Sequence, residues 1–183
     1  ACAESPCRLV SPQCGCGAGT GCYMDVDGVR SCSAAGTAPV GGTCSGTTSC
    51  VPGATCAGLG GTASGCQRFC ENDAQCTGAG ALCILDYTDT AMRPIPGVNA
   101  CTIHCDPARP TGSGCPSGST CFLGQEPDGL MRDLTHCTGA PSGSSGQGSF
   151  CTSNAQCQAG FICLDPDGFG GQCLHWCKTP PPM

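Results

Sequence analysis

The sequence predicts a small disulfide-rich protein, mostly irregular, in which short antiparallel β-hairpins form a tandem array of about five cystine-stapled units. Two observations predict this fold. The chain has 23 cysteines among 183 residues, and the spacing C-x5-C-x5-C-x9-C-x3-C occurs in residues 44–70 and again, unchanged, in residues 151–177. A cysteine content above about 8–10% in a short chain is typical of a disulfide scaffold. Cross-links, rather than a large hydrophobic core, therefore define the fold.

Bulky apolar side chains are scarce, which supports the same conclusion. The chain has five Phe, two Tyr, one Trp and four Met, against 30 Gly and 15 Pro. Burial of so little apolar surface does not offset the conformational entropy lost on folding. Disulfides persist in oxidising compartments, so we expect an extracellular or cell-surface location. Repeated C-x2-C pairs with zinc-site spacing are absent from the sequence, so no metal or other cofactor is predicted.

The charge pattern argues against two kinds of partner. The net charge is −6, with 13 acidic and 7 basic residues, and the basic residues are scattered singly. Nucleic-acid binding needs a clustered basic surface, so no nucleic-acid partner is expected. The sequence has no run of 18 apolar residues, so no transmembrane segment is predicted.

Five units follow from the cysteine frame, whose positions we call a to e. Unit 2 (44–70) and unit 5 (151–177) contain all five positions. Unit 3 (70–105) and unit 4 (105–137) each begin at the last cysteine of the unit before, so position e of one unit is position a of the next. Unit 1 (7–32) and unit 4 lack position e. The framework cysteines a to d of the five units are Cys7, Cys16, Cys22, Cys32, Cys44, Cys50, Cys56, Cys66, Cys70, Cys76, Cys83, Cys101, Cys105, Cys115, Cys121, Cys137, Cys151, Cys157, Cys163 and Cys173.

Glycines and turn signals recur at fixed places in this frame. The glycines three residues before position c are Gly19, Gly53, Gly80, Gly118 and Gly160. A glycine at one fixed offset predicts a backbone with positive φ, or a close chain approach beside the cystine. Asp-Gly signals at residues 25–28, 126–129 and 165–168 lie between c and d and predict a β-hairpin there. Helix is not expected to exceed a turn or two, because Gly, Pro and Cys interrupt every periodic window.

Two cysteine-free, glycine- and serine-rich segments, residues 33–43 and 138–150, are predicted to be linkers. They divide the chain into a first unit with an N-terminal arm (1–32), three fused units (44–137), and a last unit with a proline-rich tail (151–183).

The frame resembles the Dickkopf/colipase-like cysteine-rich modules in its spacing and in its Gly-x-x-Cys, Asp-Gly and Cys-x3-Cys elements. Unit 5 carries the likeness best, in the stretch Cys151-Thr-Ser-Asn-Ala-Gln-Cys157-Gln-Ala-Gly-Phe-Ile-Cys163, and a weaker likeness covers most of the chain. Such modules also occur in tandem in secreted cysteine-rich proteins of bacteria. The resemblance implies short hairpins on a knot-like cystine base and an extracellular binding or structural role. The shared a/e cysteines depart from a free-standing module, and no receptor-binding function is carried over.

Small cystine modules guide the pairing that we expect, because the sequence alone does not fix connectivity. Position a is expected to pair with c, and b with d, which gives ten disulfides. Three cysteines remain as candidates for free or intermolecular thiols, and they are Cys2, Cys14 and Cys177. Since 23 is odd, at least one thiol is free, lipidated or bonded to another chain.

The remaining cysteines suggest how copies of the chain associate. Cys177 is the position-e cysteine of a unit that no further unit follows, and the N-terminal arm carries two surplus cysteines. A contact between the two ends of successive subunits is heterologous, and such a contact forms a filament when it does not close. The expected partner is therefore the chain itself, as a homopolymer. Two simpler hypotheses stay open, in which Cys2 carries a lipid anchor or Cys177 is an ordinary free thiol.

Three groups of residues have side chains that can carry chemistry, and structural roles are expected for all of them. The Asp-x-Asp-Gly turns (Asp25, Asp27, Asp165, Asp167) lack the further acidic ligands of a calcium loop, so plain turns are expected. Cys14-Gly15-Cys16 lacks the electropositive setting of a redox dithiol. The histidines, His104, His136 and His175, do not share an offset in the frame. No nucleophile motif is present, so an enzyme is not expected.

The function that these expectations favour is that of an extracellular, non-enzymatic structural protein. It is a rigid disulfide-stapled rod that self-assembles head to tail into fibres. The alternative is a secreted binding module, of the receptor-antagonist or protease-inhibitor type, that uses a hairpin loop. The loop with a suitable composition is residues 84–100, with Asp86, Tyr87, Met92, Arg93 and Ile95.

Overall fold

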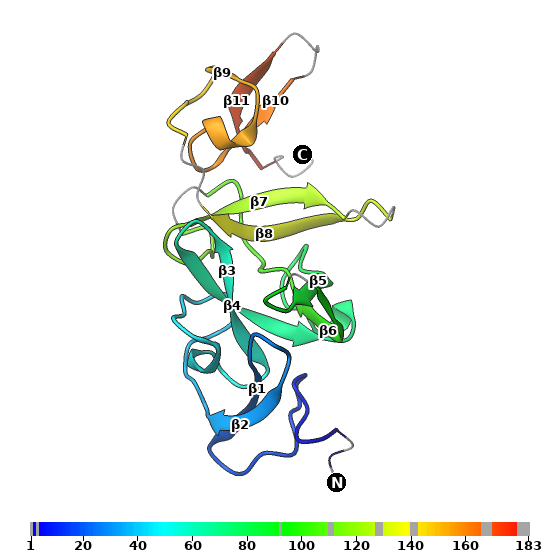
Figure 1. The fold of residues 1–183 in the computed structure, drawn as a ribbon. Coiled ribbons are helices and arrows are strands. Elements are labelled where there is room, and N and C mark those ends of the chain that lie inside the picture. Colours follow the sequence, from blue (N-terminus) through cyan, green and yellow to red (C-terminus); the bar gives the residue numbers. More distant parts are fainter. Residues whose placement is uncertain are drawn as a thin grey trace.

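The computed structural model describes residue 2 and residues 4–91, 93–109, 112–126, 130–139, 143–165 and 170–178. They form an elongated molecule with unit 1 and the N-terminus at one end and unit 5 at the other (Figure 1). Units 2, 3 and 4 fill the middle, with unit 3 to one side of unit 2. The tandem array is therefore a rod.

Each unit contains an antiparallel β-hairpin whose two strands carry positions c and d. The register places cysteine c directly opposite cysteine d in every unit, as with Cys56 and Cys66 in unit 2. The prediction of short antiparallel hairpins is confirmed. From unit 1 to unit 5 the hairpins are β1 (Thr20–Met24) with β2 (Arg30–Ala34), β3 (Ala54–Gly60) with β4 (Ala63–Cys70), β5 (Cys83–Thr88) with β6 (Pro94–Cys101), β7 (Ser119–Gln125) with β8 (Asp133–Gly139), and β10 (Phe161–Leu164) with β11 (Gly171–His175).

Two of the hairpins belong to larger sheets. The end of β4 leaves unit 2 and pairs with β6 of unit 3, so the strand order is β3-β4-β6-β5. In unit 5 the short strand β9 (Phe150–Cys151) adds to β11. Helix in the described residues is limited to the 3-10 turns η1 (Thr47–Ser49), η2 (Asp73–Gln75) and η3 (Asn154–Gln156). Within the same residues, none of these helices has the length and apolar character needed to cross a membrane.

Disulfides form the base of every hairpin. In each unit the structure joins position a to c and position b to d. The bonds stay within their units, with sequence separations from 12 to 25 residues. A chain that closes so many short loops loses much of its unfolded-state entropy, which stabilises the folded form.

The N-terminal arm corrects two of the expectations about surplus cysteines. Cys2 and Cys14 form an eleventh disulfide with a Cα–Cα distance of 5.3 Å, so neither is free or intermolecular. The arm folds back because Gly15 leaves room for it: a Cβ there would lie 2.6 Å from the carbonyl oxygen of Pro6. With its sulfur in this bond, Cys2 has no thiol left for a lipid anchor. Of the three candidates, Cys177 alone remains a free cysteine, and it is exposed.

The glycine before position c has the backbone conformation that its fixed offset predicted. Its φ is between 75° and 88° in all five units, a left-handed conformation that side chains with a Cβ disfavour. In each unit this glycine lies one to three residues before the strand that carries position c. It therefore directs the chain into the hairpin at the same place each time.

The Ala-Gln-Cys motif at position b closes the turn between a and b. In units 3 and 5 the side-chain oxygen of Asp73 or Asn154 accepts the N–H of cysteine c, at 2.7 and 2.8 Å. The carbonyl oxygen of the Gln75 or Gln156 side chain accepts a backbone N–H at the start of the turn, at 2.6 Å in both units. The repeated residues thus make repeated hydrogen bonds.

The two segments predicted to be linkers are hydrogen-bonded to the unit that follows each of them. Before unit 2, the N–H of Gly41 donates to the oxygen of Cys66 at 2.8 Å, and the N–H of Cys66 donates to the oxygen of Gly42 at 2.9 Å. Residues 148–149 make the same pair of bonds to position d of unit 5, at 2.8 and 2.9 Å. Residues 140–142 of the second segment lie outside the described residues. The parts nearest position a therefore belong to the units themselves.

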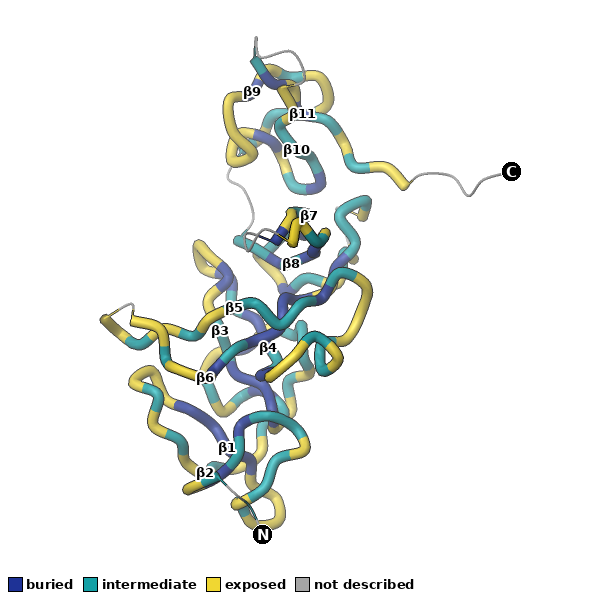
Figure 2. The backbone as a smooth tube through the Cα atoms, turned by 90° about the vertical axis from the view of Figure 1, so that its right-hand side faces the viewer, coloured by how far each residue is buried: buried dark blue, intermediate teal, exposed yellow. Residues whose placement is uncertain are grey.

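Small apolar clusters join the first four units. Phe69 and Val98 of the middle units pack against Leu9 and Met24 of unit 1. Another cluster joins Leu59 and Ala63 of unit 2 to Ile103 and to cystines of unit 4. The buried residues run along the middle of the rod from β1 through β4 (Figure 2). Unit 5, in contrast, has a cluster made of its own cysteines and Phe161.

Candidate functional site

Where the structure describes them, the aspartates of the turns accept hydrogen bonds from backbone N–H groups. Asp25 Oδ1 accepts the N–H groups of Asp27 and Val29, at 3.0 and 2.9 Å. Asp165 Oδ2 accepts the N–H of Gly170 at 3.2 Å. Residues 127–129 and 166–169, which include Asp167, lie outside the described residues. In the described stretches, the clusters of three or more potential metal-ligating side chains consist of disulfide cysteines.

The histidines occupy three separate structural positions. His104 Nδ1 donates to the oxygen of Ala79 at 2.6 Å, and the ring of His175 meets Phe161 edge-on at 5.0 Å. His136 is half-buried, and its Nδ1 accepts the N–H of Ile103 at 3.1 Å. Burial lowers the pKa of His136 below its ordinary value of about 6.5 because the charged form is poorly solvated there. The three rings therefore do not form a ligand set.

The loop expected to act in recognition is part of a packed hairpin, β5–β6. Tyr87 lies against Phe69 with ring centroids 5.7 Å apart, and burial raises its pKa above the ordinary value. Ile95 packs against unit 1. Hydrogen bonds from the backbone and side chain of Arg93 lower the pKa of Asp89 and close the hairpin end. Met92 lies outside the described residues, and Tyr87 and Ile95 pack against the cluster, which includes Val98, that joins this hairpin to unit 1.

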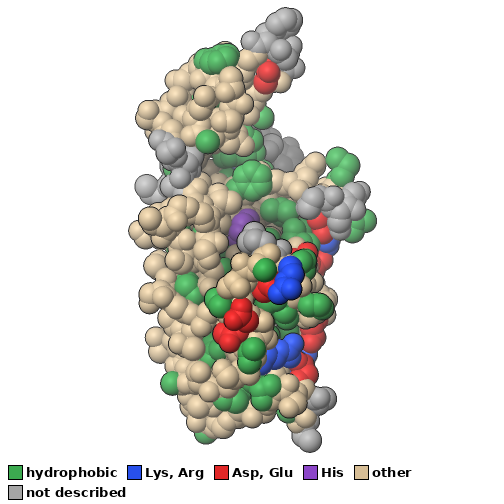
Figure 3. Space-filling model, in the orientation of Figure 1, with side chains coloured by type: hydrophobic (Ala, Val, Ile, Leu, Met, Phe, Trp, Pro, Cys, Tyr) green, Lys and Arg blue, Asp and Glu red, His purple; other side chains and the backbone are tan. Residues whose placement is uncertain are grey.

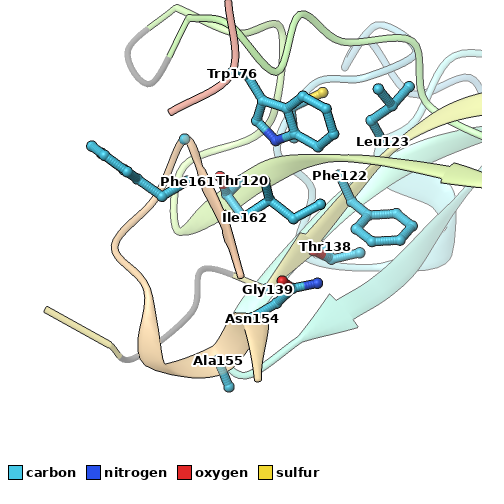
Figure 4. A pocket seen from close by; sticks show the side chains of 12 residues that line it. Thr120, Phe122, Leu123, Thr138, Gly139, Asn154, Ala155, Phe161, Ile162 and Trp176 are labelled. Atoms are coloured by element: carbon cyan, nitrogen blue, oxygen red, sulfur yellow. The ribbon is translucent and has the colours of Figure 1, made fainter. Parts of the chain in front are cut away.

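A cavity lies at the boundary between units 4 and 5, and we call it the seam cavity (Figure 4). It has a volume of about 210 Å³. Strands β7 and β8 of unit 4 form one wall, and η3, β10 and the residues after β11 form the other. The side chains that line it include Phe122, Leu123, Phe161, Ile162 and Trp176.

The chemistry of the seam cavity is apolar and uncharged. Its polar lining consists of Thr120, Thr138 and Asn154, and no Asp, Glu, Lys, Arg or His lines it among the described residues. The side-chain oxygen of Asn154 accepts the N–H of Cys163. The amide N–H groups of the Asn154 side chain can therefore donate to a group in the cavity. An apolar cavity of about 150 Å³ in another protein stays dry and binds benzene. The seam cavity is therefore suited to a small uncharged apolar group.

The free cysteine lies beside this cavity. Cys177 follows Trp176 directly and is exposed. The next residue, Lys178, has its Nζ 2.7 Å from Asp106 Oδ2 of unit 4, and this contact lowers the pKa of Asp106. The chain end therefore contacts unit 4, and Cys177, which lies between Trp176 and Lys178, is near the boundary between units 4 and 5.

Sequence reasoning did not find the seam cavity, because its walls come from hairpins in different units. Only the placement of unit 5 against unit 4 brings Phe122 toward Ile162 and Trp176. Exposure gives a partial signal: Phe122 is 41% exposed on a hairpin strand. The face in Figure 3 carries its charged side chains mainly along one edge of the lower rod, away from unit 5.

Comparisons with protein-family models, curated proteins and solved structures gave no match to this chain. The fold alone therefore defines its class. It is a small, mostly β protein of repeated cystine-stapled units, with eleven disulfides that indicate an oxidising environment.

Proposed function

We propose that this chain is an extracellular, non-enzymatic structural protein, a rigid disulfide-stapled rod that self-associates into fibres. The observation that carries the proposal is the continuous set of contacts from unit 1 to unit 4. A chain of independent binding modules has no need of such contacts, whereas a stiff element does.

The first junction, between unit 1 and the middle units, is tied by side chains. The hydroxyl of buried Tyr23 donates to the oxygen of Cys50 and accepts the N–H of Gly36, both at 2.8 Å. Arg8 pairs with both carboxylate oxygens of Glu71 at 2.8 Å. These bonds fix the orientation of unit 1 on unit 2, beside the cluster around Phe69.

The next junction, between units 3 and 4, is centred on a charged group. Arg132 pairs with Asp73 of unit 3 and with Glu126 of its own hairpin, whose side chain is 2% exposed. The two carboxylates raise the pKa of Arg132, which therefore stays charged. The N–H of Thr135 donates to the oxygen of Gly80 at 2.9 Å across the same junction.

The disulfides limit how the rods can join. Since 22 of the 23 cysteines are paired within the chain, each copy has one thiol, at Cys177. One thiol per copy links two copies and no more, so a covalent polymer is not available without rearranging existing bonds. Fibre formation in this proposal therefore rests on non-covalent contacts between rods.

Light scattering over a concentration series, with negative-stain imaging, tests this proposal. We expect the mass to rise with concentration and the images to show rods aligned end to end. Cys177→Ser is the matched control and is expected to associate as the wild type does. A monodisperse monomer at every concentration contradicts self-association.

The seam cavity favours a second candidate, a secreted binding protein for a small apolar group. Trp176 is the only tryptophan of the chain, so its fluorescence reports on the cavity directly. Titration with toluene is expected to change the emission and to saturate. Ile162→Phe fills the cavity and should abolish the response, whereas an unsaturable change in both proteins contradicts a binding site.

A further inference from the structure

In units 2, 3 and 5 a third backbone segment lies along the outer side of the strand that carries position d. Residues 41–42 bond to Cys66 in unit 2, and residues 148–149 bond to Cys173 in unit 5. In unit 3 the end of β4 pairs with β6. We call these segments the covering segments.

In unit 4 the strand that carries position d, β8, is covered by residues of unit 3, and its cysteine d is buried as well. Gly80 of unit 3 bonds to the backbone of β8, and Ile103 bonds to the ring of His136. Burial of cysteine d follows in all four units: Cys66, Cys137 and Cys173 are 0% exposed and Cys101 is 3% exposed.

Unit 1 lacks a covering segment. Its strand β2 has β1 as its only strand partner in the described chain, and its cysteine d, Cys32, is exposed. The unit's own preceding residues do not fill the place. The equivalent residues of unit 1 are Glu4 and Ser5. Glu4 contacts β2 through its side chain, in an ion pair with Arg30, and no backbone hydrogen bond joins the described part of the arm to β2. The outer edge of β2 is therefore open where the other four units are closed.

The hydrogen bonds at the ends of this hairpin show which groups point outward. The N–H of Ala35 donates to the oxygen of Gly19, at 3.0 Å, so the odd-numbered residues of β2 bond to β1. Opposed residues alternate in an antiparallel ladder, so Arg30, Cys32 and Ala34 present N–H and C=O groups to the outside. Such an edge accepts an added strand.

We propose that the outer edge of β2 accepts residues 176–178 of a second copy of this chain. This inference rests on the proposed self-association and names its site. The molecule already contains the model for it: between units 2 and 3 the covering segment is the d-to-e end of the preceding unit, Phe69–Cys70. Unit 5 has the same d-to-e end, Trp176–Cys177, and within the described chain these two residues pair with no strand.

The donor segment is weakly held in the isolated chain. Its ion pair from Lys178 to Asp106 is at the surface, where such pairs contribute little to stability. The N–H of Trp176 donates to the oxygen of Gly160 at 3.4 Å, a long hydrogen bond. The acceptor edge belongs to unit 1 and the donor segment to unit 5, so the contact is heterologous and forms a filament when it does not close.

Residue-resolved amide exchange of the full chain at low and high concentration tests the site. We expect exchange at Arg30, Cys32 and Ala34 to slow at least tenfold at high concentration. The amides of Ser31 and Ser33, already bonded to β1, should not change. Unchanged exchange at all three outward amides in a chain that does associate overturns this inference and leaves the proposed function standing.

Variants test the two partners separately. A chain ending at His175 keeps all eleven disulfides and should lose the slowing, and a peptide of residues 171–178 with serine at 177 should restore it. Ala34→Pro removes one outward N–H and should weaken association, whereas Ala34→Gly keeps it. If the chain stays monomeric while the peptide slows the three amides, the β2 site is supported and the fibre is not. If neither association nor peptide protection occurs, β2 is a terminal cap and both ideas fail.

Discussion

Tyr23 offers a direct measurement of how firmly unit 1 is attached to the rod. Tyr23→Phe removes one hydroxyl and with it two hydrogen bonds of 2.8 Å, to the oxygen of Cys50 and from the N–H of Gly36. Cys50 is 0% exposed and Tyr23 is 2% exposed, so water does not replace the lost partners. A buried polar group left without a partner costs about 1–3 kcal/mol. Since Gly36 is only half-buried, we expect a loss of about 2–3 kcal/mol in total.

Amide exchange at Gly36 and in β1 converts that loss into a rate. Because about 1.4 kcal/mol is a factor of ten, exchange that proceeds by local opening should become roughly 30- to 150-fold faster. Thr20→Val is the matched control, since the Thr20 hydroxyl is exposed and its single bond to Gly17 should matter little. An acceleration below threefold in Tyr23→Phe would refute the argument that this hydroxyl joins the units.

Three further outcomes are expected. Circular dichroism during heating should show a persistent fold in the oxidised protein and loss of structure in a reductant, because each short disulfide loop nominally contributes about 3 kcal/mol; a cooperative transition after reduction would contradict this. The pKa of His136 is lowered in the folded state, so its contribution to stability is complete above about pH 6.5 and declines as the pH falls. The protection factor of the Ile103 amide, which corrects for the slower intrinsic exchange at low pH, should therefore decrease from pH 7 to 5, and His136→Gln should remove that dependence. Arg132→Met leaves the Glu126 side chain, which is 2% exposed, without its cation and should lower the free energy of unfolding. Adding Glu126→Gln should recover part of the loss, and full additivity of the two losses would argue against the pairing.

The cysteine spacing was sufficient to predict the hairpin array because each unit repeats one local solution. Cysteines c and d lie opposite each other in the hairpin, and the glycine before c has positive φ in every unit. Local hydrogen bonds of the Ala-Gln-Cys motif add to the same arrangement. Features that repeat in sequence and act within about thirty residues were therefore accessible without a structure.

Features outside the repeat could not be predicted from the sequence. The Cys2–Cys14 bond depends on how the arm packs on Gly15, which no other unit shares. The segments before units 2 and 5 did leave a signal in the sequence: Gly36 and Gly143 each stand eight residues before position a. A Cβ at either would come within 2.3 or 2.1 Å of backbone in the following a-to-b turn, so glycine is required. Composition alone made these stretches look like linkers, although their glycines serve close packing.

The interleaved pairing also decides how the rod responds to being pulled from its ends. In unit 2 tension entering at Cys44 runs along the backbone to Cys50, crosses the disulfide to Cys66 and leaves at Cys70. The hairpin between residues 50 and 66 carries no load, because the sulfur bridge shortens the path. Even with every hydrogen bond broken, about 10 residues extend, roughly 35 Å, where an unlinked unit would extend by about 90 Å. Each cross-linked unit therefore extends little for as long as its surroundings remain oxidising, and it unravels once they are reducing.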